Sequence, residues 1–396
     1  MPRFEPFTGI RYDPDAVDLD RVVAPPYDVI SPEERHALGE RDPHNVVHVD
    51  LPVDEPGRDR YTAAGCRLDE WLAEHVLVED EEPAFYVYRM GYHDAEGRPR
   101  QTSGVIGALE LSVPGEGDVL PHERTMSKPK DDRLNLLRSC RANLSPIWVL
   151  SLAEGLSGLC ELPGPPDARC TDDEGVHHRL WRITQPGIVS ALTDAVASAP
   201  VVIADGHHRY ETALAYRDER RAEGAGPGDH DLLMAYAVEL ADEQLTIDPI
   251  HRLLSTLPPD TDLVGTLAEW FELFDAGPPT TSLPARMADA GALALVLPGQ
   301  AWLLKPRDGD DADRSDADRL DAVLGSLPPH ELAYQHGVDN VLALVEKGDA
   351  QAGILLRPVS VKQMEAAARA GRRLPEKTTF FYPKLLTGLV FRRLTS

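Results

Sequence analysis

The clearest hydrophobic pattern in the chain lies near its middle, where a short apolar run meets a longer amphipathic one. Residues 200–204 read PVVIA, a continuous apolar run typical of a buried strand. Residues 210–224, YETALAYRDERRAEG, carry apolar positions at helical spacing and predict a helix that ends near Gly224. Between them stand Asp205-Gly206-His207-His208-Arg209, and the helix is expected to begin near His208 or Arg209. The pattern therefore predicts a strand, a charged turn and a helix.

The same periodicities predict further elements on both sides of this unit. Ser31-Pro32 fits an N-cap followed by proline at the first helical position. Two aromatic or β-branched runs around a glycine-containing turn predict a hairpin over 84–112. Apolar spacing and length predict helices over 57–78, 187–199 and 263–274, a buried strand over 232–241, strands on both sides of Gly299, and a linker over 155–174.

The mixture of strands and helices predicts an α/β (α+β) protein. A chain of 396 residues favours two or three folded units. We expect an N-terminal α/β region over 1–110 and a core over 111–255 with an insertion around 153–180. A C-terminal α/β region over 256–396 is expected to pack on that core, because the tail ends in aromatic and apolar residues.

Charge and composition narrow the class of protein. The net charge of −26 disfavours a nucleic-acid partner, because proteins that track phosphates carry a basic surface. No segment has the length and apolar character of a membrane span, and the sequence MPRFEPFTGI has no features of a secretory signal. The scattered cysteines favour reduced thiols over a disulfide framework: Cys66, Cys140, Cys160 and Cys170. These features predict a cytoplasmic protein; a homo-oligomer is left open.

The charged turn between strand and helix predicts an anion site. Free backbone N–H groups and the helix dipole favour a phosphate there, and Gly206 allows its close approach. Arg209 offers a planar fork, and His207 and His208 add donors. Asp205 suits Mg²⁺ coordination or the orientation of a histidine. Two alternatives remain: a zinc site, which lacks the usual i, i+4 histidine pair, and a helix cap formed by Asp205.

A second constellation, LPHERTMSKPKDDRLNLL, precedes the turn. Glu123 beside His122 could act as a general base, and Lys128 and Lys130 could meet phosphates as point charges. The alternative is a mixed-charge surface loop. The doublet His177-His178 is expected at the surface, and so is the acidic run over 307–321.

A third stretch, VVAPPYDVI with DPHNVVHVDLP behind it, offers polar groups near apolar strands. Tyr27, Asp28 and Asn45 could line a pocket, although turn formation is the simpler interpretation. Lys377, Tyr382 and Lys384 in the tail are weaker candidates. The sequence contains no Walker A, G-x-S-x-G or G-x-G-x-x-G pattern, which disfavours P-loop, α/β-hydrolase and Rossmann proteins.

Four motifs in this order resemble a bacterial and archaeal family of unknown function, DUF ten-fifteen: APPYDVIS, LPHERT…KPKDDRLNLLR, VVIADGHHRYETAL and RLPEKTTFFYPKLLTGLV. The turn itself resembles the D-G-x-H-R box of the ParB/sulfiredoxin-like fold. That resemblance implies a mixed-sheet core with N-terminal and C-terminal elaborations and a nucleotide phosphate at the start of the helix. Sulfiredoxin's cysteine before His-Arg has no counterpart, since His207 precedes His208, and a sulfinic-acid reductase is disfavoured.

Free-serine kinases of that superfamily carry a glutamate base in an upstream H-E segment, to which His122-Glu123 is similar. The resemblance implies a nucleotide-dependent kinase that phosphorylates a metabolite hydroxyl, with free L-serine as the first acceptor to consider. Its cofactors would be Mg²⁺ with ATP or ADP, and Asp205 would hold the metal. The alternative is a regulatory protein that binds CTP or ATP without phosphotransfer. A nuclease is a third hypothesis, which the acidic composition weakens.

Overall fold

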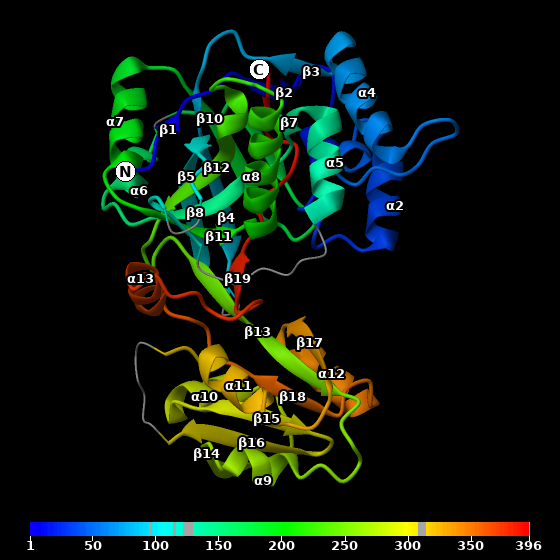
Figure 1. Ribbon diagram of the computed structural model, residues 1–396, viewed down its shortest axis with the longest axis vertical. Helices are drawn as coiled ribbons and strands as arrows, with labels where there is room; N and C mark the ends of the chain where they lie inside the picture. Colours follow the sequence, from blue (N-terminus) through cyan, green and yellow to red (C-terminus); the bar gives the residue numbers. More distant parts are fainter. Residues whose placement is uncertain (95–96, 114–115, 122–129, 163, 308–313, 396) are drawn as a thin grey trace. The chain divides into compact units, whose positions relative to one another are not determined.

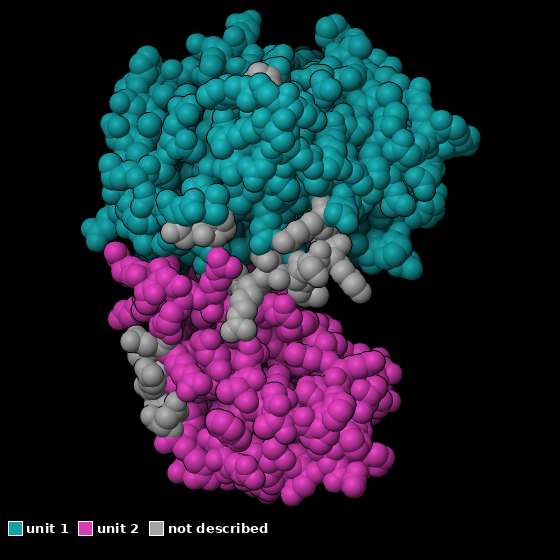
Figure 2. Space-filling view, in the orientation of Figure 1, with its two compact units in different colours: residues 1–121, 125–245, 383–396 teal, residues 122–124, 246–382 magenta. Residues whose placement is uncertain are grey.

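The computed structural model of the protein describes residues 1–94, 97–113, 116–121, 130–162, 164–307 and 314–395. These residues form two compact units (Figure 2). Unit 1 holds the described residues of 1–245 together with those of 383–396, and unit 2 holds those of 246–382. Each unit has hydrophobic clusters of its own.

The main sheet of unit 1 is mixed, which confirms the α/β class (Figure 1). Its strands run in the order β6-β11-β8-β12-β5-β4-β10-β9, and β1 pairs with β5. The pairs β6–β11 and β8–β12 are parallel, and the other neighbours are antiparallel. The strands are β1 (Phe4–Glu5), β4 (Phe85–His93), β5 (Pro99–Glu110), β6 (Val119–Pro121), β8 (Ile147–Ser151), β9 (Ala168–Thr171), β10 (His177–Ile183), β11 (Val201–Asp205) and β12 (Leu232–Glu239).

Local sequence accounts for most of these strands. The predicted hairpin is β4 and β5, which pair in antiparallel register from Tyr86–Ile106 to His93–Pro99. The apolar runs at β11 and β12 are buried as predicted, because both strands lie inside the sheet with neighbours on either side. Their side chains share one core cluster with α7 and α8.

The helices of unit 1 follow the predicted caps and periodicities. Ser31 caps α2 through a reciprocal capping box with Glu34, and Pro32 is its first residue. The predicted helices over 57–78 and 187–199 correspond to α4 and α7. The helices are α1 (Leu19–Val22), α2 (Pro32–Arg41), α3 (Val47–Asp50), α4 (Arg60–Ala73), α5 (Lys130–Cys140), α6 (Leu156–Leu159), α7 (Pro186–Ala197), α8 (His207–Ala222) and the 3-10 helix η1 (Asp229–Asp231).

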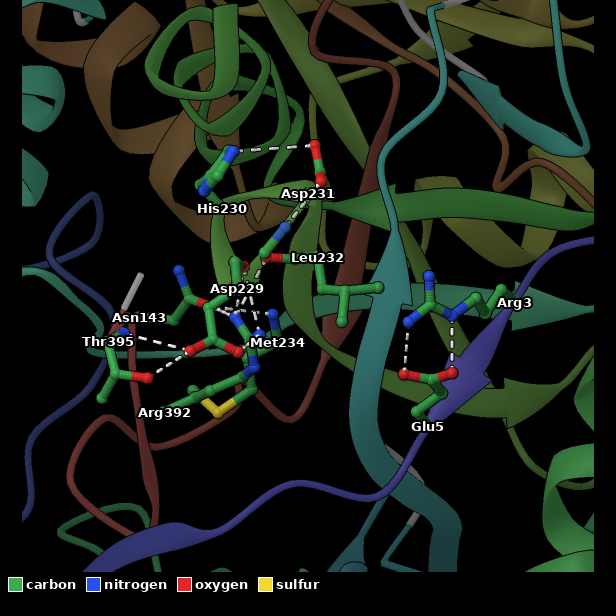
Figure 3. Close-up of polar contacts among 11 residues, drawn as sticks. Arg3, Glu5, Asn143, Asp229, His230, Asp231, Leu232, Met234, Arg392 and Thr395 are labelled. Atoms are coloured by element: carbon green, nitrogen blue, oxygen red, sulfur yellow. Dashed lines mark hydrogen bonds and ion pairs between the residues drawn. The ribbon is translucent and has the colours of Figure 1, made fainter. Parts of the chain in front are cut away.

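The C-terminal segment, residues 383–395, belongs to unit 1. A small sheet runs in the order β3-β2-β20-β7, with β2 (Gly9–Tyr12), β3 (Leu77–Glu79), β7 (Ala142–Asn143) and β20 (Phe391–Arg393). The buried Arg392 of β20 donates to the carbonyl oxygens of Asp229 and Leu232 at 3.1 Å each (Figure 3). Asp229 also accepts from the hydroxyl of Thr395 at 2.6 Å. These bonds join the C-terminal segment to η1 and to the first residue of β12.

Unit 2 is an antiparallel sheet with helices. Its order is β14-β16-β15-β18-β13-β17, and β19 also pairs with β13. The predicted strands on both sides of Gly299 form the hairpin β15–β16. The elements are β13 (Thr246–Ser255), β14 (Phe271–Gly277), β15 (Leu293–Leu297), β16 (Gln300–Pro306), β17 (Glu331–His336), β18 (Ala352–Leu355), β19 (Thr379–Tyr382), α9 (Leu263–Ala268), α10 (Leu283–Ala290), α11 (Asp316–Leu324), α12 (Val338–Lys347) and α13 (Val361–Arg369).

Several local predictions are wrong. The helix predicted over 263–274 ends at Ala268, and β14 begins at Phe271, because pairing with β16 overrides the local pattern. The segment predicted as a linker contains α6 and β9. His178 is fully buried rather than at the surface, because side chains alternate along β10 and only His177 faces outward. In the acidic run, Asp316 is buried at the start of α11.

Candidate functional site

The predicted strand–turn–helix unit is present in unit 1. Strand β11 ends at Asp205, Gly206 has the left-handed φ of 90°, and α8 begins at His207. A side chain at Gly206 would be crowded, since a Cβ would lie 2.8 Å from Cγ2 of Ile147 and 3.1 Å from Nε of Arg209. Glycine is therefore required here by both backbone conformation and close approach. The turn directs the first-turn N–H groups of a sixteen-residue helix away from the strand.

Two buried side chains hold α8 against the sheet. The hydroxyl of Tyr210 donates to the carbonyl oxygen of Ser112 at 2.8 Å, and Arg217 donates to the carbonyl oxygen of Leu111 at 3.0 Å. Helix α5 lies beside α8 (Figure 1). The position of α8, and with it that of its first turn, is therefore held by the bonds of Tyr210 and Arg217 to the segment that follows β5.

Arg209 joins the turn to the loop before β8. Its Nη1 donates to Oγ of Ser145 at 3.0 Å and to the carbonyl oxygen of Pro146 at 2.5 Å. Its Nη2 lies 3.5 Å from Oδ2 of Asp205, and Nζ of Lys384 lies 3.6 Å from Oδ1 of the same carboxylate. Two cationic groups, those of Arg209 and Lys384, therefore lie beside Asp205, each at long distance.

A pocket opens along the face of α8 next to Arg209. Its volume is about 60 Å³, and polar groups from separate segments line it: Tyr27, Asp50, Arg133, Ser145, Arg209 and Thr212. Leu136, Leu144 and Leu233 supply apolar wall. The pocket therefore combines charged groups with a partly apolar lining, as small-molecule sites do.

Asp50 and Arg133 form a buried ion pair in the wall of this pocket. Nη1 of Arg133 lies 3.1 Å from Oδ1 of Asp50, and both side chains are 7% exposed. Nη2 of Arg133 also donates to Oδ2 of Asp132 at 2.7 Å, and Asp132 accepts from the hydroxyl of Tyr61 at 2.9 Å. The guanidinium lies over the ring of Tyr27, 4.2 Å from its centroid.

Burial changes the acidity of the pocket groups. Burial raises the pKa of the Asp50 carboxyl, although the positive charges of Arg133 and Arg209 oppose the shift. Burial likewise raises the pKa of Tyr27 to about 12, so its hydroxyl is protonated at neutral pH. The pocket thus offers a hydroxyl donor, a buried carboxyl and two guanidinium groups.

The chain matches the family described as protein of unknown function (DUF1015) over residues 4–353. The chain belongs to this family. No curated protein matches this DUF1015 chain.

Three solved structures are similar to the DUF1015 chain at low identity. A mutant free serine kinase in complex with ADP is 12% identical over 67% of this chain and 84% of that one, with a TM-score of 0.38. A conserved hypothetical protein from Pyrococcus furiosus is 14% identical over 68% and 89%, with a TM-score of 0.37. SbnI with a C-terminal truncation, from Staphylococcus aureus, is 13% identical over 71% and 85%, with a TM-score of 0.40.

The structure describes some of the site residues predicted from the sequence and leaves others outside the described residues. Asp205, Gly206, His207, His208 and Arg209 lie together at the end of β11 and the start of α8. His122, Glu123 and Lys128 lie outside the described residues. Lys130 is the first residue of α5, and its side chain is not among those described.

Sequence reasoning missed the polar wall of the pocket. Of the lining residues, Tyr27 and Arg209 are candidates from the sequence, whereas Asp50, Arg133 and Thr212 are not. Asp50 stands at the end of the DPHNVVHVD stretch, and Arg133 stands in the KPKDDR motif. The one signal for Asp50 and Arg133 in the sequence is that each is a charged residue at the edge of such a motif.

The described residues contain no group of three or more His, Cys, Asp and Glu side chains arranged to hold a metal ion. No helix in the described part of the chain has the length and apolar character that a membrane crossing needs.

Proposed function

We propose that this protein is a nucleotide-dependent small-molecule kinase whose nucleotide phosphates bind at the start of α8. The observation that carries the proposal is the left-handed Gly206 between β11 and α8, followed at once by His207, His208 and Arg209. First-turn N–H groups and the positive end of the helix dipole favour a phosphate. The neighbouring pocket, with buried polar groups from four segments, supports a second ligand beside that phosphate.

The cationic groups at the turn suit the charge of a nucleotide. Arg209 contacts Asp205 only at 3.5 Å, and its other bonds go to neutral oxygens of Ser145 and Pro146. A phosphate would therefore offer its guanidinium a stronger partner than it now has. Lys384, brought to the turn by the C-terminal segment, adds a second positive charge. Lys128 and Lys130 are proposed to meet the same phosphates.

The donor set at the turn fits Mg²⁺ carried by a nucleotide. Mg²⁺ is usually held by one or two carboxylates together with phosphate oxygens and water. Asp205, at the end of β11, is the carboxylate proposed to hold it. When bound, the ion would neutralise charge on the transferring phosphoryl group. Arg209 and Lys384 would then turn from Asp205 toward the phosphates.

Glu123 is the proposed base for the acceptor hydroxyl, with His122 beside it. Pro121, the residue before His122, pairs with Ile203 in the parallel register of β6 and β11, two residues before Asp205. The carboxyl end of β6 is thus close to the start of α8, which supports a role for the residues that follow it. In the reaction, the hydroxyl oxygen bonds to the terminal phosphorus, the bond from phosphorus to the nucleotide breaks, and Glu123 takes the hydroxyl proton.

Phosphorus NMR tests the proposed reaction. The protein is incubated with Mg²⁺, ATP or ADP and a pool of hydroxylated metabolites that includes L-serine. We expect a new phosphomonoester signal that Glu123→Gln lowers by about 10²-fold or more, because general-base catalysis contributes about 10²–10⁴-fold. Glu154→Gln, which changes an exposed glutamate of unit 1, serves as the matched control and should keep full activity.

Nucleotide binding without any acceptor-dependent product would contradict the kinase. That result would favour the alternative, a regulatory protein that binds ATP or CTP at the same turn. Equal loss of activity in Glu123→Gln and Glu154→Gln would contradict the assignment of Glu123 as the base, but not the kinase activity itself.

A further inference from the structure

The pocket beside α8 is too small for a nucleotide. Its volume of about 60 Å³ is far below the roughly 300 Å³ at which sites for larger ligands begin. It nevertheless exceeds the roughly 10–15 Å³ that one water molecule needs. The pocket therefore fits a compact molecule of a few heavy atoms, and the start of α8 lies at its edge through Arg209.

Two polar atoms in the pocket wall are buried without a hydrogen bond of normal geometry. They are Oδ2 of Asp50, a residue 5% exposed, and Oγ1 of Thr212, a residue 4% exposed. The hydroxyl of Thr387 lies near enough to favour the charged form of Asp50, but it does not have the geometry of a hydrogen bond to Oδ2. Leaving such atoms unpaired is costly, which points to a partner that arrives from outside the chain.

A buried carboxylate with a purely structural role looks different in this protein. Asp316 of unit 2 accepts from the main-chain N–H and Nε of Arg357 on Oδ2, and from Nη2 of Arg357 on Oδ1. Both of its oxygens are satisfied at 2.8–3.0 Å. Asp50 has one oxygen bonded to Arg133 and the other left for a donor. The difference indicates that Asp50 does more than neutralise Arg133.

We propose that this pocket binds a small polar metabolite and that Oδ2 of Asp50 accepts a hydrogen bond from the metabolite's hydroxyl or ammonium group. Thr212 and Tyr27 supply further polar contacts from α8 and from the APPYDV segment. Because Arg209 lines the pocket and also stands in the first turn of α8, the bound molecule lies next to the proposed phosphate site. Its assignment as the phosphoryl acceptor rests on the proposed function, whereas the binding itself does not.

Binding to the nucleotide-free, full-length protein tests the proposal. Glycerol, ethanolamine and glycolate are titrated separately at millimolar concentrations and followed by saturation-transfer NMR. We expect saturable binding of at least one probe, weakened about tenfold or more by Asp50→Asn, because a hydrogen bond to a charged group contributes about 1.5–3 kcal/mol. Preference for glycerol over ethanolamine identifies a hydroxyl donor, and the reverse identifies an ammonium.

Asp132→Asn is the matched control. Asp132 also pairs with Arg133, but it does not line the pocket, so its loss disturbs the guanidinium without removing the proposed ligand contact. Probe affinity in this variant should stay close to that of the wild type. Saturation by no probe, or equal weakening in Asp50→Asn and Asp132→Asn, would overturn the proposal.

A second variant covers the case in which Asp50→Asn does not fold. Thr212→Val keeps the shape of a buried wall residue and removes only its hydroxyl, and we expect it to weaken the best probe several-fold. Unchanged affinity in a Thr212→Val protein would count against the pocket. ADP affinity is measured in the same samples. Probe binding without ADP binding would contradict the proposed function but support the metabolite pocket. ADP binding without probe binding would contradict the pocket but leave the proposed function intact.

Discussion

Each unit contains a nearly inaccessible arginine that donates to main-chain carbonyl oxygens, Arg392 in unit 1 and Arg252 in unit 2. Arg392 donates to carbonyl oxygens of Asp229 and Leu232, and Arg252 donates to those of Ile250 and Lys377. Arg252 also lies 4.7 Å from the ring centroid of Tyr334. In both units these guanidinium groups join distant segments of main chain. Buried charge alone therefore does not mark a functional site in this protein.

The two units differ in what surrounds their remaining buried charges. In unit 1, Asp50, Arg133 and Arg209 come from three separate segments and line one pocket. In unit 2, both side-chain oxygens of Asp316 accept hydrogen bonds from Arg357. The candidate site therefore differs from the ion pair of unit 2 in one respect: Asp50 lines a pocket and has one oxygen without a hydrogen bond.

Replacing the two buried arginines should give the largest effects. Arg392→Met leaves main-chain carbonyl oxygens of unit 1 without their donor, and Arg252→Met does the same in unit 2. We expect each change to lower the free energy of unfolding by about 3–5 kcal/mol. Hydrogen–deuterium exchange should show faster exchange in unit 1 peptides for Arg392→Met and in unit 2 peptides for Arg252→Met. Identical exchange patterns in the two variants would contradict a separate anchoring role in each unit.

Mild acid should destabilise unit 2. Burial, with His336 and Arg252 nearby, lowers the pKa of His251 from 6.5 to about 4, and Asp248 opposes the shift. Below pH 6.5 the unfolded chain binds a proton that the folded unit resists, so stability present above pH 6.5 is lost as the pH falls toward 4. The difference between a pKa of 6.5 in the unfolded chain and one of about 4 in the folded unit corresponds to roughly 3 kcal/mol of stability.

Exchange rates of unit 2 peptides, followed from pH 7 to pH 4 and corrected for intrinsic exchange, measure this loss. His251→Asn keeps an acceptor for the N–H of Leu356, which His251 accepts at 3.2 Å, but removes the titration. The variant should therefore show a flatter pH profile. An equally steep profile in His251→Asn would assign the acid sensitivity to another group.

The sequence predicted the local elements of the candidate site better than its full lining. The apolar run predicts β11, the glycine predicts the turn, and the amphipathic spacing predicts α8. The pair of Asp50 with Arg133 joins residues 83 positions apart, and no local pattern reports such a contact. Lys384 reaches Asp205 because the C-terminal segment returns to unit 1, a consequence of tertiary packing. The burial of His178 depends on the register in which β10 pairs with β4 and β9. The glycine- and proline-rich stretch before His178 predicts a linker, so the sequence does not reveal this strand.

The central claim is that nucleotide phosphates bind at the start of α8, and its most direct test is calorimetric titration of Mg²⁺–ADP into two glycine variants. Gly206 and Gly224 stand at opposite ends of α8 with φ of 90° and 93°, but a Cβ meets close atoms only at Gly206. Both alanine substitutions carry a similar backbone strain of about 1–3 kcal/mol.

The account predicts that Gly206→Ala weakens ADP binding at least about tenfold, since it distorts the N–H groups that face the phosphate. Gly224→Ala should bind ADP as the wild type does. Equal ADP affinity in both variants and the wild type would contradict a phosphate site at the start of α8.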